Sequence, residues 1–128
     1  MEFRESQPIY LQIAEFVCEK ILMKEWKLEE RIPSVRELAM GLQVNPNTVM
    51  RTYEFLQQKN IIYNQRGVGL FVSPHAYDSA LEYRKGEFIQ KEMPSFFRSM
   101  ALLQIEIEEL EPLFKKIKKT TLLKFTKL

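Results

Sequence analysis

The sequence contains little of the chemistry that metals, disulfides or membranes require. It has one cysteine, Cys18, and one histidine, His75, among 128 residues, which excludes an intrachain disulfide, a thiol cluster and a His-paired metal site. No apolar run approaches the roughly 20 residues of a membrane helix, and no signal peptide opens the chain. The net charge is only +2, so overall charge does not indicate a partner. These absences predict a soluble, cytoplasmic protein without a cofactor.

Catalytic equipment is also lacking. The chain has no nucleophile paired with histidine, no carboxylate dyad and no phosphate-binding loop, so we do not expect an enzyme. What is present is a hydrophobic fraction of 45%, which is enough for a packed core and too much for a disordered segment.

Three helices are predicted in the first 60 residues. Apolar residues spaced three and four apart predict the first helix over Pro8–Met23, and the charged loop that follows has Trp26 and Leu28 as expected anchors. Ser34 and Glu37 form a capping box for a second helix over residues 35–41. Asn45 and Pro46 begin a third helix, which ends at Lys59–Asn60. The expected inward positions are Ile9, Ile13, Phe16, Val17, Ile21, Val35, Leu38, Ala39, Leu42, Val49, Tyr53 and Leu56.

A hairpin follows the third helix. Ile61–Tyr63 and Leu70–Val72 are apolar and β-branched or aromatic, as in strands, and Gly67 and Gly69 lie between them where a turn is needed. Three helices and a two-stranded hairpin, in this order, predict a mainly α fold of the winged helix-turn-helix class over residues 1–74.

Residues 75–128 form a second predicted segment. A helical pattern runs from Asp78 to about Leu103, with Pro94 as a bend or break, and a shorter helix covers about residues 106–118. The tail from Lys115 holds six lysines and no acid, and we expect it to fray. The apolar residues favour a helical dimerisation segment, with a ligand cage for the aromatic side chains as the alternative. The expected dimer contacts are Leu81, Phe88, Phe96, Leu103 and Leu110.

The third helix has the properties of a DNA recognition helix. Its first turns are polar on the side opposite the apolar stripe, and amide, hydroxyl and guanidinium groups suit base edges and phosphates. The predicted DNA contacts are Arg36, Asn45, Asn47, Thr48, Arg51, Arg66 and Gly67. Three alternatives stay open: a surface ion pair for Arg36, capping alone for Asn45, and an ordinary solvated face for residues 47, 48 and 51.

These motifs also resemble those of the GntR family of bacterial transcription regulators. The resemblance covers about residues 8–73 and rests on PIYLQI (8–13), IPSVRELA (32–39), VNPNTV (44–49), Tyr53 with Leu56, and RGVGLFV (66–72). It implies that Arg36, residues 45–51 and the Arg66–Gly67 wing tip contact DNA. The short remainder is similar to the YtrA-type branch, whose C-terminal helices mainly dimerise the protein.

The chain departs from that family at the loop before Ile32. Two glycines and a proline are usual there, and the corresponding positions are Lys24, Leu28 and Glu29. If the backbone keeps a positive φ at such sites, each costs on the order of 1 kcal/mol. Met50 also stands where some branches have arginine, which removes one strong base contact.

The predicted function is a homodimeric, sequence-specific transcription regulator, with repression favoured over activation, on a near-palindromic operator. An effector molecule is allowed but not identified. The alternative is a winged-helix module that binds protein through the same face, and the arginines at 36, 51 and 66 favour DNA.

Overall fold

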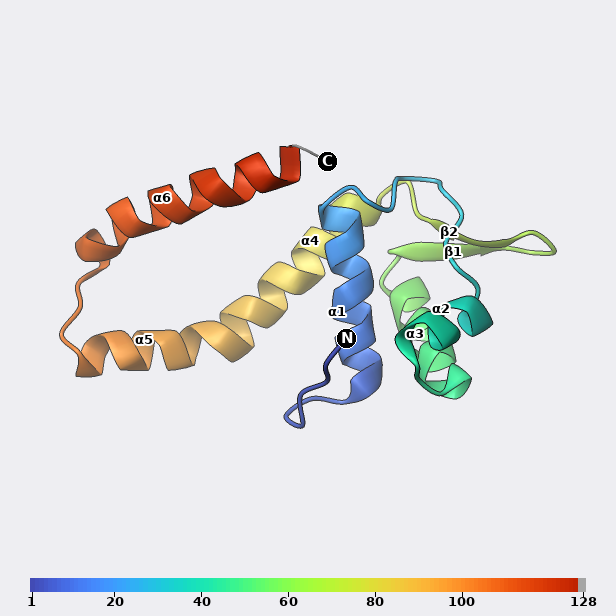
Figure 1. The fold of residues 1–128 in the computed structure, drawn as a ribbon, viewed down its shortest axis with the longest axis horizontal. Helices are drawn as coiled ribbons and strands as arrows, with labels where there is room; N and C mark the ends of the chain where they lie inside the picture. The colour runs from blue at the N-terminus through green and yellow to red at the C-terminus, as the bar shows by residue number, and fades with distance from the viewer. Residues whose placement is uncertain (127–128) are drawn as a thin grey trace. The chain divides into compact units, whose positions relative to one another are not determined.

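The computed structural model describes residues 1–126, and the side chains of residues 1–120. The chain divides into two compact units, Met1–Arg84 and Lys85 onward. The first unit contains α1 (Ile9–Leu22), α2 (Val35–Leu42), α3 (Pro46–Gln58), β1 (Ile62–Gln65), β2 (Gly69–Val72) and most of α4 (Ala76–Glu87). Figure 1 shows the two strands extending as a ribbon beyond α2 and α3, with the turn at its far end. This confirms a mainly helical winged helix-turn-helix.

The core of the first unit lies where the three helices meet the base of the hairpin. Most of the predicted inward residues are buried or packed against this core, but two expectations are wrong. Ile9 is 44% exposed because it stands at the first residue of α1, and Leu28 is 51% exposed in the loop. Trp26 alone of the two predicted anchors packs against the core. The buried set is Ile13, Ala14, Val17, Cys18, Ile21, Ile32, Leu38, Ala39, Val49, Tyr53, Leu56, Ile61, Ile62, Val72, Ala76 and Ala80.

The predicted helix caps are confirmed. The Ser34 hydroxyl accepts a hydrogen bond from the Glu37 N–H, and the Ser34 N–H donates to the Glu37 carboxylate at 3.0 Å. The latter bond stabilises the ionised carboxylate and lowers the pKa of Glu37. Pro46 stands in the first turn of α3, whereas Pro8 is the residue before α1 rather than its first residue.

The strands of the hairpin differ slightly from their predicted bounds. Strand β1 begins one residue later and ends two residues later than predicted, and β2 begins one residue earlier. Ile62 pairs with Val72 and Gln65 with Gly69, so residues 66–68 form the turn. A third extended segment lies along the free edge of β2: the Ile32 N–H donates to the Leu70 carbonyl, and Arg31 forms a bridge with Phe71. The loop before α2 is therefore part of the wing.

The backbone of that loop takes the left-handed conformation without glycine. Lys24 has φ 60° and Glu29 has φ 61°, so at two of the three positions that depart from the family pattern the condition of a positive φ is met. Gln43 and Asn60 are also left-handed, at the ends of α2 and α3. Asn tolerates this conformation well, whereas Lys, Glu and Gln are strained in it.

The helical pattern after the hairpin is confirmed, but its division differs from the prediction. Ala76 and Ala80 of α4 belong to the core of the first unit. The second unit continues α4 with a π-helical turn, η1 (Phe88–Glu92), followed by α5 (Met93–Leu102) and α6 (Ile107–Thr126). Pro94 lies in the first turn of α5, directly after the π turn, so the predicted irregularity occurs there. Helix α6 extends past its expected end at Lys118 to Thr126. The expected fraying of this tail stays a prediction, and residues 127 and 128 lie outside the described part.

The second unit has almost no core. Among residues 85–120, Met100 is the one buried side chain, at 7% exposure. Two of the predicted dimer contacts in this unit, Phe96 and Leu103, are 53% and 65% exposed. None of the helices within residues 1–126 has the length and apolar character that crossing a membrane would demand.

Candidate nucleic-acid interface

Helix α3 is fixed to the rest of the winged domain by two buried hydroxyl groups. The Thr52 Oγ1 donates to the Tyr10 carbonyl of α1 at 2.7 Å, and the Tyr53 hydroxyl donates to the Pro33 carbonyl before α2 at 2.8 Å. Burial also raises the pKa of Tyr53, so this hydroxyl keeps its proton. The apolar side of α3 meets the core through Val49 and Leu56. These contacts leave the opposite side of the helix free.

The turn between α2 and α3 places the first residues of α3 at the surface. Gln43 ends α2 with a left-handed backbone, and the Val44 N–H donates to the Ala39 carbonyl at 3.0 Å. Asn45 then caps α3, and its side-chain oxygen accepts from the Asn47 N–H at 2.8 Å. The capping role of Asn45 is thus present, and its amide NH₂ group is the part that can still donate to DNA.

Asn47, Thr48 and Arg51 lie together beside the start of α1. With Pro8, Ile9 and Tyr10 they line a shallow hollow of about 370 Å³. The Arg51 guanidinium carbon lies 3.9 Å from the centre of the Tyr10 ring, a cation–π contact that orients the guanidinium without neutralising it. Asn47 and Arg51 are exposed, and Thr48 is half-buried. The three predicted contacts from α3 therefore form one polar, positively charged surface.

Arg36 stands apart from that group, on the exposed side of the first turn of α2. Among the described residues it forms no ion pair, which removes the support for a surface salt bridge as its role. Its charge is therefore available to a phosphate.

The wing tip carries the other two predicted contacts. Arg66 and Gly67 are exposed in the turn, where the Val68 N–H donates to the Gln65 carbonyl at 2.9 Å. Gly67 has φ 78°, which requires glycine or a tolerant residue such as Asn. Among the described residues, nothing beyond the two chain neighbours of Gly67 lies within 4 Å of a Cβ built on it. The turn therefore leaves room for a partner to approach the backbone.

Sequence reasoning missed three residues that shape this surface. Arg31 extends over Gly69, and its Nε lies 2.9 Å from where a Cβ of that glycine would stand, which adds a cation to the outer face of the wing. Thr52 and Tyr10 were not expected to position α3 and Arg51. A polar Thr52 inside the apolar stripe was the one local signal. The pairing of Arg31 with β2 is long-range, and no local pattern indicates it.

Cys18 takes no part in this surface. It is fully buried, and burial raises the pKa of its thiol to about 12. The thiol therefore stays protonated and unreactive, which is typical of a core cysteine and not of a redox sensor.

Comparison with known proteins agrees with this geometry. Residues 9–72 match the model of the bacterial regulatory proteins of the gntR family. The chain belongs to the GntR family. Its members are transcription regulators rather than enzymes.

Individual relatives extend the similarity beyond the winged domain. The chain is 34% identical over 114 residues to the HTH-type transcriptional repressor YtrA of Bacillus subtilis, covering 89% of this chain and 87% of that protein. The crystal structure of a GntR-family regulator from Bacteroides thetaiotaomicron superposes with a TM-score of 0.71 at 44% identity, covering 89% of this chain and 99% of the other. The similarity to YtrA over most of the chain confirms the YtrA-like character of this GntR regulator.

The DNA-binding domain of AraR, solved in complex with its operator ORR3, also superposes on this chain. The TM-score is 0.51 and the identity 26%, covering 57% of this chain and 86% of that domain. The winged domain of this GntR regulator is thus a DNA-binding domain. Its individual contacts, from Arg36 to Gly67, remain predictions.

Proposed function

We propose that the protein is a homodimeric repressor that binds a near-palindromic operator through its two winged domains. The N-terminal part of α3 would enter the major groove, Arg36 would contact the backbone that α2 crosses, and Arg66 with Gly67 would approach the neighbouring phosphates or minor groove. The observation that carries this proposal is the surface that Asn47, Thr48 and Arg51 form together, in which Tyr10 orients the Arg51 guanidinium and no described acid pairs with it.

The dimer is supported by the exposed apolar side chains of the second unit. Phe96, Phe97 and Leu103 are between 45% and 65% exposed in a single chain, and apolar surface of this kind marks an interface. A dimer that spaces two recognition helices about 34 Å apart would read two half-sites in successive major grooves. The relation to YtrA, which is named a repressor, supports repression over activation.

The proposal includes a small-molecule effector and, since the partner is genomic DNA, a location in the bacterial cytoplasm. The protein-interaction module has no specific observation in its favour, because within the described residues Arg36, Arg51 and Arg66 form no ion pair with an acid and suit phosphates.

Selection of binding sequences from random duplex DNA tests the proposal directly. We expect an enriched sequence with two-fold symmetry, bound at least about 10³-fold more tightly than a scrambled duplex. Affinity should fall linearly on a log–log plot against salt concentration because counterions are released. Failure to enrich any sequence, or affinity independent of salt, would contradict the proposal and favour a protein partner.

A further inference from the structure

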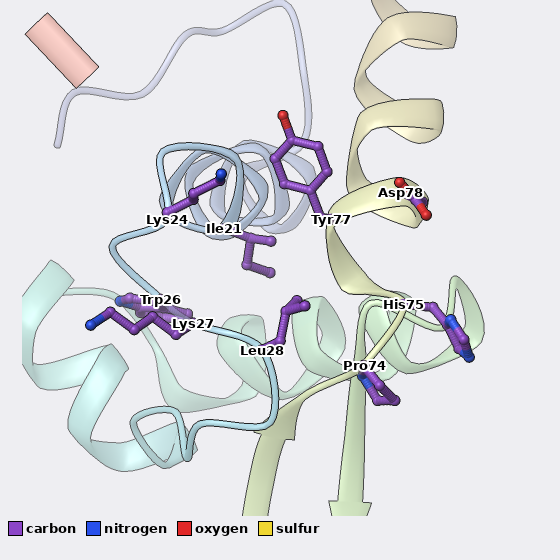
Figure 2. Close-up of a pocket in the computed structure, with 9 residues that line it drawn as sticks. All are labelled: Ile21, Lys24, Trp26, Lys27, Leu28, Pro74, His75, Tyr77 and Asp78. Atoms are coloured by element: carbon purple, nitrogen blue, oxygen red, sulfur yellow. The ribbon is translucent and has the colours of Figure 1, made fainter. Parts of the chain in front are cut away.

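The winged domain has a second hollow, formed by residues that take no part in the predicted DNA contacts. Its volume is about 520 Å³, within the range of small-molecule sites in proteins. Three segments of the first unit form it: the end of α1, the loop that follows, and the chain that leads from β2 into α4. The lining residues, shown in Figure 2, are Ile21, Lys24, Trp26, Lys27, Leu28, Pro74, His75, Tyr77 and Asp78.

The walls of this hollow are mainly apolar and aromatic. Ile21 is buried, and Trp26 packs partly against the core. Leu28 of the loop and Tyr77 of the first turn of α4 are 51% and 37% exposed. In Figure 2 these four side chains lie around one space. A flat or compact apolar group that enters the hollow can therefore contact apolar side chains on several sides.

The two sides of the hollow differ in charge. The Lys24 Nζ lies 5.8 Å from the centre of the Tyr77 ring, and within the described residues neither Lys24 nor Lys27 forms an ion pair. Figure 2 shows both lysines on the side of the loop, with Asp78 across the hollow on α4. Lys24 is also held at φ 60°, and a strained backbone at a cavity often accompanies ligand binding. One side of the hollow thus offers two cations without a protein anion.

We propose that this hollow is a binding site for a small organic anion with an aromatic or other flat apolar body. The apolar body lies among Trp26, Leu28 and Tyr77, and the acidic group is held by the ammonium groups of Lys24 and Lys27. The site gives the effector part of the proposed function a place and a ligand class. The site contains none of the predicted DNA contacts, so an experiment can show loss of ligand binding without loss of DNA binding, or the reverse.

Tryptophan fluorescence makes the test specific, because Trp26 is the one tryptophan of the chain. The probe is 8-anilinonaphthalene-1-sulfonate, an aromatic anion, and the matched neutral probe is N-phenyl-1-naphthylamine, which has the same rings without the sulfonate. Titration of the full-length protein with the sulfonate should quench Trp26 emission in a saturable manner, with one probe bound per chain. The neutral probe should bind about tenfold more weakly or worse, because it lacks a charge-assisted contact.

Matched variants assign the binding to this hollow. Lys24→Gln with Lys27→Gln should reduce the affinity for the sulfonate to that of the neutral probe, and Tyr77→Ala should weaken both probes. Lys116→Gln, on the exposed side of α6, should change neither. Circular dichroism checks that each variant is folded.

Two results would overturn the proposal. One is quenching of Trp26 by both probes with equal affinity in the unmodified protein. The other is an affinity for the sulfonate that the changes at residues 24, 27 and 77 leave intact. The proposed operator-binding function is measured separately, with duplex DNA in the absence of either probe.

Discussion

The two units of the chain differ in how far they bury their apolar residues. The winged unit buries Leu56, Val49 and Ile13 completely and satisfies its buried Gln12 with three hydrogen bonds to the N-terminal segment. The second unit leaves most of its large apolar side chains exposed; among residues 85–120 Met100 is the one buried residue, and Met93, Ile105 and Leu110 are half-buried. The winged unit therefore has its own core, whereas the helices after Arg84 leave an apolar surface exposed, which is the surface that the proposed dimer would cover.

The largest expected effect comes from removing a core residue of the winged unit. Leu56→Ala should lower the free energy of unfolding by about 2–5 kcal/mol, measured by urea titration, and the loss should not depend on protein concentration. Phe96→Ala should instead weaken association, so its effect should grow as the protein is diluted. Equal losses for both variants at every concentration would mean that the second unit has a core of its own.

The next comparison separates two kinds of DNA contact within the winged unit. Arg36→Ala should weaken binding to specific and random duplexes alike and reduce the salt slope by about one, because phosphates carry no sequence information. Asn47→Ala should cost about 1–3 kcal/mol on the selected duplex and much less on random DNA. Isotherms for both variants on both duplexes, at several salt concentrations, measure this. Equal losses for Asn47→Ala on the two duplexes would reassign that residue to phosphate contact.

A smaller effect is expected at the turn of the wing. Gly67→Val should cost roughly 1–2 kcal/mol in duplex binding, because a β-branched residue resists the left-handed backbone, while the helical content stays unchanged. Gly67→Asn is the matched variant, since Asn tolerates that backbone. Retained affinity with Asn identifies the conformation as the requirement, and lost affinity identifies close approach of DNA. Unchanged binding by a folded Gly67→Val would exclude the wing tip from the interface.

The smallest effect concerns the strained loop at the edge of the wing. Glu29 has φ 61°, so Glu29→Gly should raise the free energy of unfolding by up to about 1 kcal/mol. Glu30→Gly, next to it and without a positive φ, should lower it by about 0.5–1 kcal/mol. Thermal or urea unfolding distinguishes the two. A destabilising Glu29→Gly would show that this backbone conformation carries no strain that glycine relieves.

Much of the winged unit could be predicted because its signals are local. The capping box of Ser34 and Glu37, the Asn45–Pro46 helix start and the left-handed Asn60 each follow from residues a few positions apart. The long-range contacts could not be predicted. The hydrogen bond from Thr52 to Tyr10, the stacking of Arg51 on Tyr10 and the pairing of Arg31 with β2 depend on how the elements pack.

The position of the boundary between the two units also could not be predicted from local sequence patterns. A boundary after residue 74 follows from the change in composition, yet Ala76 and Ala80 pack into the winged core. Small residues give no strong periodic signal, so their burial depends on the neighbouring helix. A truncation that isolates the winged unit should therefore end after Arg84 rather than after residue 74.

Sedimentation equilibrium of the full-length chain at micromolar concentration tests the central claim most directly, which is that the exposed helices of the second unit join two winged domains. The account predicts a mass of twice the 15.3 kDa of one chain, and a mass near one chain for the Phe96→Glu variant. A single-chain mass for the unmodified protein across the micromolar range would contradict it.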